Sequence, residues 1–218
     1  MALFRPSAMQ TDFRPISVTL DEVGHSFGHQ AVFSGISITV EAGAECLVRG
    51  ANGSGKSTLG GIFACELSPE NGTLEWHMGN EIITPERVLN ATSRVSPNTG
   101  LHPDLSIEEL IQFQGQFREW RPELDPLDWL GSAGLSGQTL QKRFGTLSSG
   151  MQQRVKLTLA LAADTGLVVL DEPCANLDEE GQVWYRQFRK SIASQTTVIV
   201  CSNDRAEDTL GPNQVIDL

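Results

Sequence analysis

Apolar and polar residues alternate in two segments near the start of the chain, 16–20 and 36–40. A period of two is typical of a β-strand that buries one face and exposes the other to water. Glycines punctuate the stretch 16–49, which favours short antiparallel strands, and further strand character follows at 73–76 and 82–83. The alternating apolar positions are Ile16, Val18, Leu20, Ile36, Ile38 and Val40.

Three other short runs are continuously apolar: 46–48, 167–170 and 197–200. Strands that are buried on both faces have this pattern, and each run has helical sequence beside it. The pattern predicts an α/β fold with a parallel sheet and helices on both of its faces. In such folds the functional loops lie at the carboxyl ends of the strands.

The stretch from about 104 to 165 has no strand pattern and is predicted to be helical. One helix is expected over Ser106–Glu119, because Ser106 and Glu109 have the spacing of a capping box. A second helix is expected over Met151–Ala163, just after Ser148, which is a good N-cap residue.

Length and composition favour one globular domain. The 218 residues suffice for a full core, and no run approaches the roughly 18 apolar residues that a membrane-spanning helix requires. The start of the chain reaches Pro6 before any signal-peptide core, so the expected compartment is the cytoplasm. We expect an arm at 1–15 and a single domain at 16–218, with a helical subdomain at about 98–165.

The net charge bears on the kind of partner, and the cysteine pattern bears on the role of the thiols. A formal net charge of −11, with no visible basic patch, argues against a nucleic-acid partner. The cysteines are scattered without a C-x-x-C pair or a His/Cys cluster, so we expect them to be reduced core residues. They are Cys46, Cys65, Cys174 and Cys201.

A glycine-rich loop follows the first continuously apolar run. In such a loop successive backbone N–H groups turn inward around the β- and γ-phosphates of a nucleotide, and the next helix directs its positive end at them. Lys56 would supply a mobile cation and Ser57 a Mg²⁺ ligand. The alternative is a chance glycine-rich turn. The candidate phosphate-binding residues are Gly50, Ala51, Asn52, Gly53, Ser54, Gly55, Lys56, Ser57 and Thr58.

Two carboxylates follow the second apolar run, in Asp171-Glu172-Pro173. The topology of a parallel sheet brings this strand end near the glycine-rich loop. Asp171 would then hold the Mg²⁺ shell, and Glu172 would orient and polarise an attacking water. Alone, the pair reads as an acidic turn after a strand, which is common in α/β proteins.

A third motif, Leu147-Ser148-Ser149-Gly150-Met151-Gln152-Gln153-Arg154, opens the second predicted helix. Its Ser148 hydroxyl and the first free N–H groups of the helix would form an anion site. The alternative is that Ser148 only caps the helix. With the other two motifs in order, the chain resembles the ATP-binding cassette (ABC) ATPases. The resemblance implies a P-loop NTPase with a RecA-like parallel sheet core, a small antiparallel β subdomain and a helical insert.

The resemblance also implies an assembly. In the family, Ser148 and Gly150 bind the γ-phosphate held by the opposite subunit, so a homodimer closing on two ATP molecules is the simplest arrangement. Ala175–Asp178 matches the D-loop that crosses the dimer seam. Phe27 falls where the family stacks an aromatic ring on adenine. A core or turn role for this Phe is the alternative, with His25 or His29 as substitutes.

Four positions, in three motifs, depart from the family pattern. Ser149 and Met151 replace a glycine and a glutamine, and Ser149 would be strained if it required positive φ. Asn203 stands at the switch histidine and can donate a hydrogen bond but cannot carry charge or relay a proton. Asn98, or Pro97 by a shift of one residue, stands at the Q-loop glutamine, and Asn98 remains a candidate ligand for the metal or the water. We expect slow hydrolysis, with a hydrolysis-deficient nucleotide sensor as the alternative.

The minimal length and these motifs look like the subunit of the haem-exporter, or cytochrome c maturation, type. The resemblance implies a separate membrane-spanning subunit that docks on the helical subdomain, around 98–129, and a cytoplasmic location peripheral to the inner or plasma membrane. The aromatic residues of that face are Phe113, Phe117, Trp120 and Trp129, most of them expected in the core. ABC proteins acting on nucleic acid or ribosomes would need a basic face. A small-molecule P-loop kinase would leave the third motif without a role.

Overall fold

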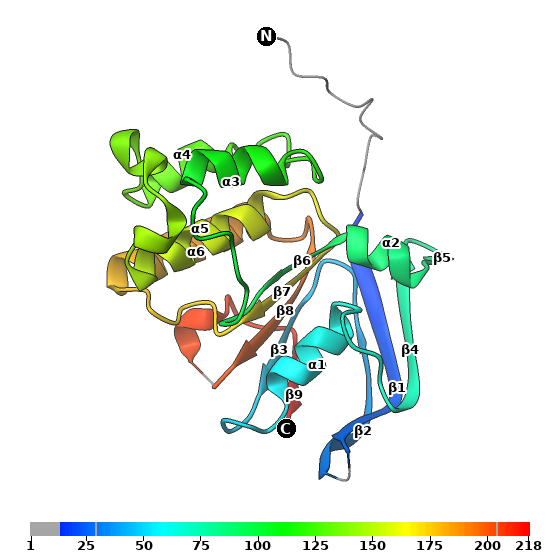
Figure 1. Cartoon of the computed structure of the whole chain (residues 1–218). Coiled ribbons are helices and arrows are strands. Elements are labelled where there is room, and N and C mark those ends of the chain that lie inside the picture. The colour runs from blue at the N-terminus through cyan, green and yellow to red at the C-terminus, as the bar shows by residue number, and fades with distance from the viewer. Residues whose placement is uncertain (1–13, 29, 204) are drawn as a thin grey trace.

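The computed structural model describes residues 14–28, 30–203 and 205–218 and contains two sheets (Figure 1). One is antiparallel with strand order β2-β1-β4-β5, and the other is parallel with order β6-β7-β8-β3-β9. This is the α/β arrangement that the sequence predicted. The expected arm at 1–15 falls almost entirely on residues 1–13, outside the described residues, as does His29.

The antiparallel sheet is built from the alternating segments near the start of the chain. Its strands are β1 (Ile16–Phe27), β2 (Gln30–Val40), β4 (Asn71–Met78) and β5 (Glu81–Ile82). β1 and β2 are longer than the short strands expected. Their pairing changes register at several points after Leu20, and these irregularities interrupt the alternation without ending either strand.

The parallel sheet contains the three continuously apolar runs as β3 (Glu45–Arg49), β7 (Leu167–Asp171) and β8 (Thr197–Ser202). It also contains two strands that the pattern missed, β6 (Thr92–Val95) and β9 (Gln214–Asp217). β6 has the polar sequence Thr-Ser-Arg-Val yet lies against β7, and β9 is an edge strand with one buried residue. Apolar content alone identified neither.

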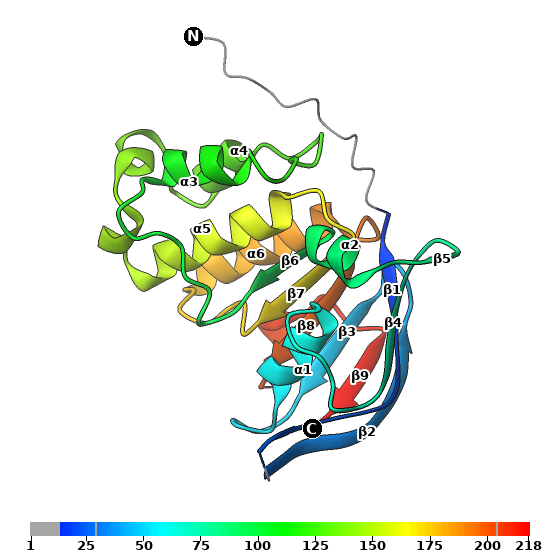
Figure 2. The same ribbon diagram turned by 45° about the vertical axis from the view of Figure 1, so that its right-hand side comes forward.

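Successive residues of the central strands enter two different cores. Val169 and Ile199 join the core shared with the antiparallel sheet and α1 (Lys56–Phe63). Their neighbours Val168 and Val200 join the opposite core, with α5 (Ser149–Ala162) and α6 (Glu179–Ser191). Figures 1 and 2 show α1 and α5 on opposite sides of the parallel sheet, as expected for strands buried on both faces.

The remaining helices are α2 (Pro85–Asn90), α3 (Ile107–Gln114) and α4 (Pro126–Ser132), with short 3₁₀ turns at Gly137–Gln141, Phe144–Thr146 and Ala206–Asp208. Among the described residues between β6 and β7 there is no named strand. α3 and α4 lie over α5, away from the antiparallel sheet (Figure 2). A third apolar core lies beneath them.

The capping box of α3 is present as predicted: Ser106 Oγ accepts from the Glu109 N–H, and the Glu109 carboxylate accepts from the Ser106 N–H. The helix ends at Gln114, however, not at Glu119. Gly115 is the C-cap, and after it the Arg118 guanidinium turns inward to donate to the Thr92 carbonyl at 2.6 Å. A tertiary contact therefore ends the helix earlier than its polar sequence indicated.

The four cysteines are free, and three of them are buried as expected. Burial, with a smaller contribution from the Glu45 carboxylate, raises the pKa of the Cys46 thiol to about 12. Burial likewise raises the pKa of Cys174 and of Cys201. Cys65 is only half-buried. These thiols stay protonated at neutral pH, which agrees with a structural role.

A buried ion pair joins α6 to the start of β3. Arg189 Nη2 lies 2.9 Å from Glu45 Oε2, with side-chain exposures of 3% and 10%. We predict that Arg189→Met lowers the free energy of unfolding by about 3–5 kcal/mol, because it leaves a buried carboxylate without its cation. Urea denaturation at neutral pH measures this change.

Arg87→Met is the matched control, since Arg87 forms an exposed ion pair with Glu81 at 2.9 Å. Its removal should change stability by about 0–1 kcal/mol. Equal effects of the two substitutions would show that burial does not set the strength of the Arg189 pair.

Candidate nucleotide-binding and hydrolysis site

The glycine-rich loop joins β3 to α1 at the carboxyl edge of the parallel sheet. Gly55, the N-cap of α1, has φ +105° and packs so closely on β2 that a Cβ atom there would overlap Val32. Glycine is therefore required both by backbone conformation and by space. The loop thus directly precedes the N-terminus of α1, the position from which N–H groups could bind a phosphate, and phosphate binding here stays a prediction.

Lys56 is buried and its ammonium is held by the loop itself. Nζ donates to the carbonyl oxygens of Gly50 and Ala51, both at 2.9 Å. The loop therefore holds the lysine cation close to its own backbone. Ser57, the next residue, is exposed, and its carbonyl accepts from Arg94 at 2.9 Å.

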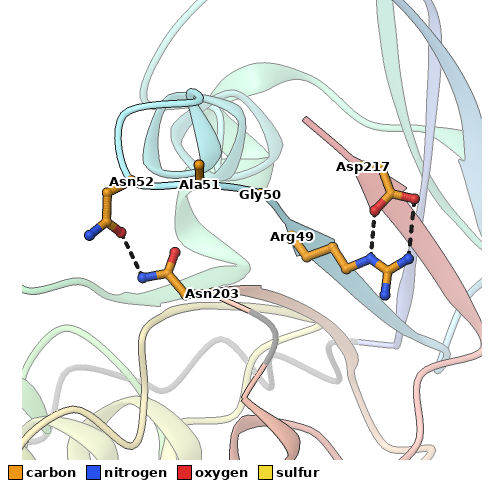
Figure 3. A pocket seen from close by; sticks show the side chains of 6 residues that line it. All are labelled: Arg49, Gly50, Ala51, Asn52, Asn203 and Asp217. Atoms are coloured by element: carbon orange, nitrogen blue, oxygen red, sulfur yellow. Dashed lines mark hydrogen bonds and ion pairs between the residues drawn. The ribbon is translucent and has the colours of Figure 1, made fainter.

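A pocket of about 470 Å³ opens beside this loop (Figure 3). On one side, Asn203 Nδ2 donates to Asn52 Oδ1 at 2.6 Å and to Glu172 Oε1 at 3.1 Å. On the other side, Arg49 Nε donates to Asp217 Oδ1 at 2.5 Å. The structure thus brings together Asn52, Glu172 and Asn203, which the sequence placed in separate motifs.

Asp171 and Glu172 stand at the end of β7. Asp171 is buried, and within the described part of the chain its Oδ2 has no hydrogen-bond partner. Glu172 has φ +48°, and its N–H donates to the Cys201 carbonyl at 2.8 Å. A non-glycine residue in the left-handed region is strained, and such strain clusters at functional sites.

The third motif lies elsewhere in the chain. Ser148 is exposed and caps α5, with its Oγ accepting from the Met151 N–H at 3.3 Å. Ser149 is the first residue of α5 and is not among the residues with positive φ, so the expected strain does not arise. This motif therefore keeps an exposed helix N-terminus with a good cap.

The α5 motif packs on the Ala175–Asp178 loop, and within the described residues no hydrogen bond joins it to the glycine-rich loop. A Cβ at Gly150 would lie 2.8 Å from the Asn176 carbonyl, and Arg154 Nη2 donates to Asp178 Oδ1 at 2.5 Å. Asp178 also caps α6. The two proposed halves of an ATP site are thus separated within one chain.

Two further candidates lie at the margins of the site. Phe27 ends β1 with 60% of its surface exposed, and its ring packs edge-on to His25 with centroids 5.0 Å apart. It is therefore not a core residue. Asn98 lies exposed in the loop that follows β6, whose neighbour β7 ends in Asp171.

Arg94 is a residue that sequence reasoning missed. From β6 its guanidinium contacts the Glu66 carboxylate and donates to the Ser57 carbonyl, so it fixes the first turn of α1. The available signal was a lone arginine within a short strand. Without knowledge that 92–95 is a strand, that signal could not be recognised.

The family profile and the similar proteins all indicate the same family. The ABC transporter family profile matches residues 33–175. The cytochrome c biogenesis ATP-binding export protein CcmA of Chelativorans sp. (strain BNC1) is 33% identical over 175 residues, 80% of this chain and 85% of that protein. The protein of the same name from Paraburkholderia xenovorans (strain LB400) is 26% identical over 209 residues, 88% of this chain and 92% of that protein.

Solved structures share the fold. The structure of an ATP-binding subunit of an ABC transporter superposes with a TM-score of 0.80 at 18% identity, covering 92% of this chain and 85% of that one. A dimeric bacterial ABC transporter cassette superposes with a TM-score of 0.76 at 23% identity, covering 92% and 94%. With the family profile spanning most of the two sheets and the three motifs in order, the chain belongs to the ABC transporter family, as an ATP-binding cassette that hydrolyses ATP.

Proposed function

We propose that two copies of this chain close on two ATP molecules and drive a separate membrane-spanning subunit. The observation that carries the proposal is the contact of Asn203 with both Asn52 and Glu172. Through it, Asn203, the proposed hydrogen-bond donor to the γ-phosphate, contacts both the glycine-rich loop and Glu172, the proposed base.

The glycine-rich loop would hold the β- and γ-phosphates through its N–H groups, while Lys56 turns from the Gly50 and Ala51 carbonyls toward the phosphate oxygens. Phe27, exposed at the end of β1, would stack on the adenine. These contacts orient the terminal phosphate toward Glu172. Positioning of this kind provides most of the catalysis in phosphoryl transfer.

Mg²⁺ fits the oxygen donors at the end of β7. Asp171 Oδ2 is buried without a partner among the described residues, and a buried carboxylate oxygen is costly unless a cation or donor satisfies it. Ser57 would add a hydroxyl ligand, and Asn98 is a candidate to hold a further ligand position. A bound Mg²⁺ would neutralise charge on the β- and γ-phosphates. No group of three His, Cys, Asp or Glu that could hold a metal occurs in the described residues, so phosphate oxygens would complete the shell.

Glu172 would accept a proton from the attacking water and direct it at the γ-phosphorus, while the Asn203 amide donates to a γ-phosphate oxygen. Asn203 is neutral at all relevant pH values, so it contributes geometry without a charge or a proton relay. This difference from the family histidine supports slow hydrolysis. It is also the observation that favours the second candidate, a nucleotide sensor with little turnover.

The dimer is supported by the separation of the motifs. Ser148 and Gly150 carry an exposed helix N-terminus on the side of the Ala175–Asp178 loop. A second copy related by two-fold symmetry would present this N-terminus to the γ-phosphate held here, and the first copy would do the same in return. Neither copy alone would then complete a site.

A membrane partner is supported by a groove of about 660 Å³ on the helical region. Phe113 and Phe117 line it with 54% and 71% of their surfaces exposed, and their ring centroids lie 5.1 Å apart. Trp120 and Trp129, by contrast, are partly buried and pack against an apolar core. Since none of the four is fully buried, the expectation that most of these aromatics lie in the core is wrong. No helix in the described residues is long and apolar enough to span a bilayer.

The groove has a mostly apolar lining. Leu101, Leu105 and Leu159 line it beside the phenylalanines, with His102 and Arg118 also in its lining. An exposed apolar patch of this kind marks an interaction site, and an amphipathic helix fits such a groove. Since relatives are named as export proteins of cytochrome c biogenesis, we propose that the partner is the membrane subunit of such an exporter. The chain would then lie at the cytoplasmic face of the membrane.

Glu172→Gln tests the site. The glutamine amide cannot accept the proton, so we predict that phosphate release falls about 100-fold or more, while ATP is still bound. Light scattering with Mg-ATP should then record a lasting dimer, whereas the wild type dimerises transiently. The control is Glu41→Gln, at an exposed glutamate outside the site, which should behave as wild type. A monomeric, silent wild type that binds ATP would favour the sensor.

Phe117→Asp tests the groove. The introduced charge should abolish co-purification with a co-expressed cytochrome c biogenesis membrane subunit from the same organism, because the groove would have to bury it. ATP binding should not change. Val183→Asp, at an exposed apolar residue on α6, is the control and should keep the complex. Retention of the complex by both variants would exclude the groove as the docking site.

A further inference from the structure

A buried carboxylate links the two strand ends that carry the proposed hydrolytic residues. Asp208 lies in the 3₁₀ turn Ala206–Asp208 and is 1% exposed. Its Oδ1 accepts from the Cys174 N–H at 3.0 Å, and its Oδ2 accepts from the Ser202 hydroxyl at 2.5 Å. One side chain therefore joins the segment after β7 to the end of β8.

Both contacted residues are sequence neighbours of the proposed machinery. Cys174 comes two residues after Glu172, and Ser202 comes directly before Asn203. The Ser202 hydroxyl also accepts from the Arg205 N–H at 3.2 Å, which holds the start of the loop after Asn203. Glu172 and Asn203 are in direct contact at 3.1 Å. The segments that hold them are also joined by a second, buried connection through Asp208.

The same carboxylate adjoins the loop that would cross the dimer seam. Cys174 immediately precedes Ala175–Asp178, whose Asn176 packs on Gly150 and whose Asp178 pairs with Arg154. A displacement at Cys174 would therefore move both Glu172, on one side, and this loop, on the other. Hydrogen bonds to a buried carboxylate are strong, and removal of the carboxylate leaves a main-chain N–H and a hydroxyl unpaired.

We propose that Asp208 is a positioning residue that fixes the distance between Glu172 and Asn203 and couples it to the Ala175–Asp178 loop. Its carboxylate is buried, and it acts through Cys174 and Ser202. The proposal rests on the roles assigned above to Glu172 and Asn203. A misplacement of about 1 Å between such groups costs on the order of 100-fold in rate.

The chain offers a matched control in Tyr185. Its hydroxyl donates to the main-chain carbonyl of Asp208 at 2.9 Å and is buried to the same degree, but it makes no hydrogen bond to the carboxylate. Tyr185→Phe therefore loosens the same turn and leaves both carboxylate bonds available. Asp208→Asn is the conservative variant, because an amide oxygen can still accept from Cys174 and its NH₂ can donate to the Ser202 oxygen.

The experiment compares Asp208→Ala, Asp208→Asn and Tyr185→Phe by kcat for ATP hydrolysis, by equilibrium binding of fluorescent ATP, and by urea unfolding. We expect Asp208→Ala to lower kcat about 10- to 100-fold with the ATP Kd within about twofold, and Asp208→Asn to recover most of the rate. Tyr185→Phe should lose stability and keep kcat within about twofold of wild type. Two results would overturn the proposal. One is a folded Asp208→Ala variant whose kcat stays within about twofold of wild type. The other is a loss of kcat in Tyr185→Phe as large as that in Asp208→Ala.

Glu172→Gln, measured alongside, separates this proposal from the one it rests on. If Glu172→Gln abolishes hydrolysis and Asp208→Ala does not lower it, only the positioning role fails. If Glu172→Gln hydrolyses ATP at the wild-type rate, the site assignment fails, and the Asp208 proposal fails with it.

Discussion

The burial of β3, β7 and β8 on both faces is the constraint on which the rest of the structure depends. Side chains such as Val169 and Val168 enter different cores on opposite sides of the sheet, so these strands cannot slide or shift register without exposing apolar surface. Their carboxyl ends consequently meet at one fixed edge. The glycine-rich loop and Asn203 follow two of those ends, and Asp171–Glu172 lie at the third, so the core determines their convergence.

That edge would form only half of the proposed site. The helix N-terminus at Ser148 is exposed, and it is tied to the Ala175–Asp178 loop through Gly150 and Arg154. A free helix N-terminus favours an anion, and the glycine-rich loop of the same chain lies elsewhere. Two-fold symmetry satisfies both surfaces at once, since each copy supplies what the other lacks. The separation within the chain is thus the structural argument for assembly around nucleotide.

Sequence reasoning found the fold because β3, β7 and β8 are continuously apolar and parts of β1 and β2 alternate between apolar and polar residues. It failed where tertiary context overrides composition: β6 is polar in sequence yet pairs with β7, and α3 ends at Gln114 because Arg118 turns inward to Thr92. The motif residues were identifiable because phosphate chemistry fixes their types and spacing, although their roles remain predictions. Asp208 was not identifiable, because its significance lies in contacts with Cys174 and Ser202, 34 and 6 residues away in the chain.

The proposed place of Asn203 at the family's switch histidine has a consequence for how the site would work. An imidazolium would hold a phosphate by charge over a range of positions, whereas a neutral amide depends on hydrogen-bond geometry, which weakens steeply with misalignment. Asn203 already divides its donors between Asn52 and Glu172. A site of this kind would rely on a rigid frame beneath the amide, and in our proposal the buried carboxylate of Asp208 would supply it through its hydrogen bond to Ser202, one residue before Asn203.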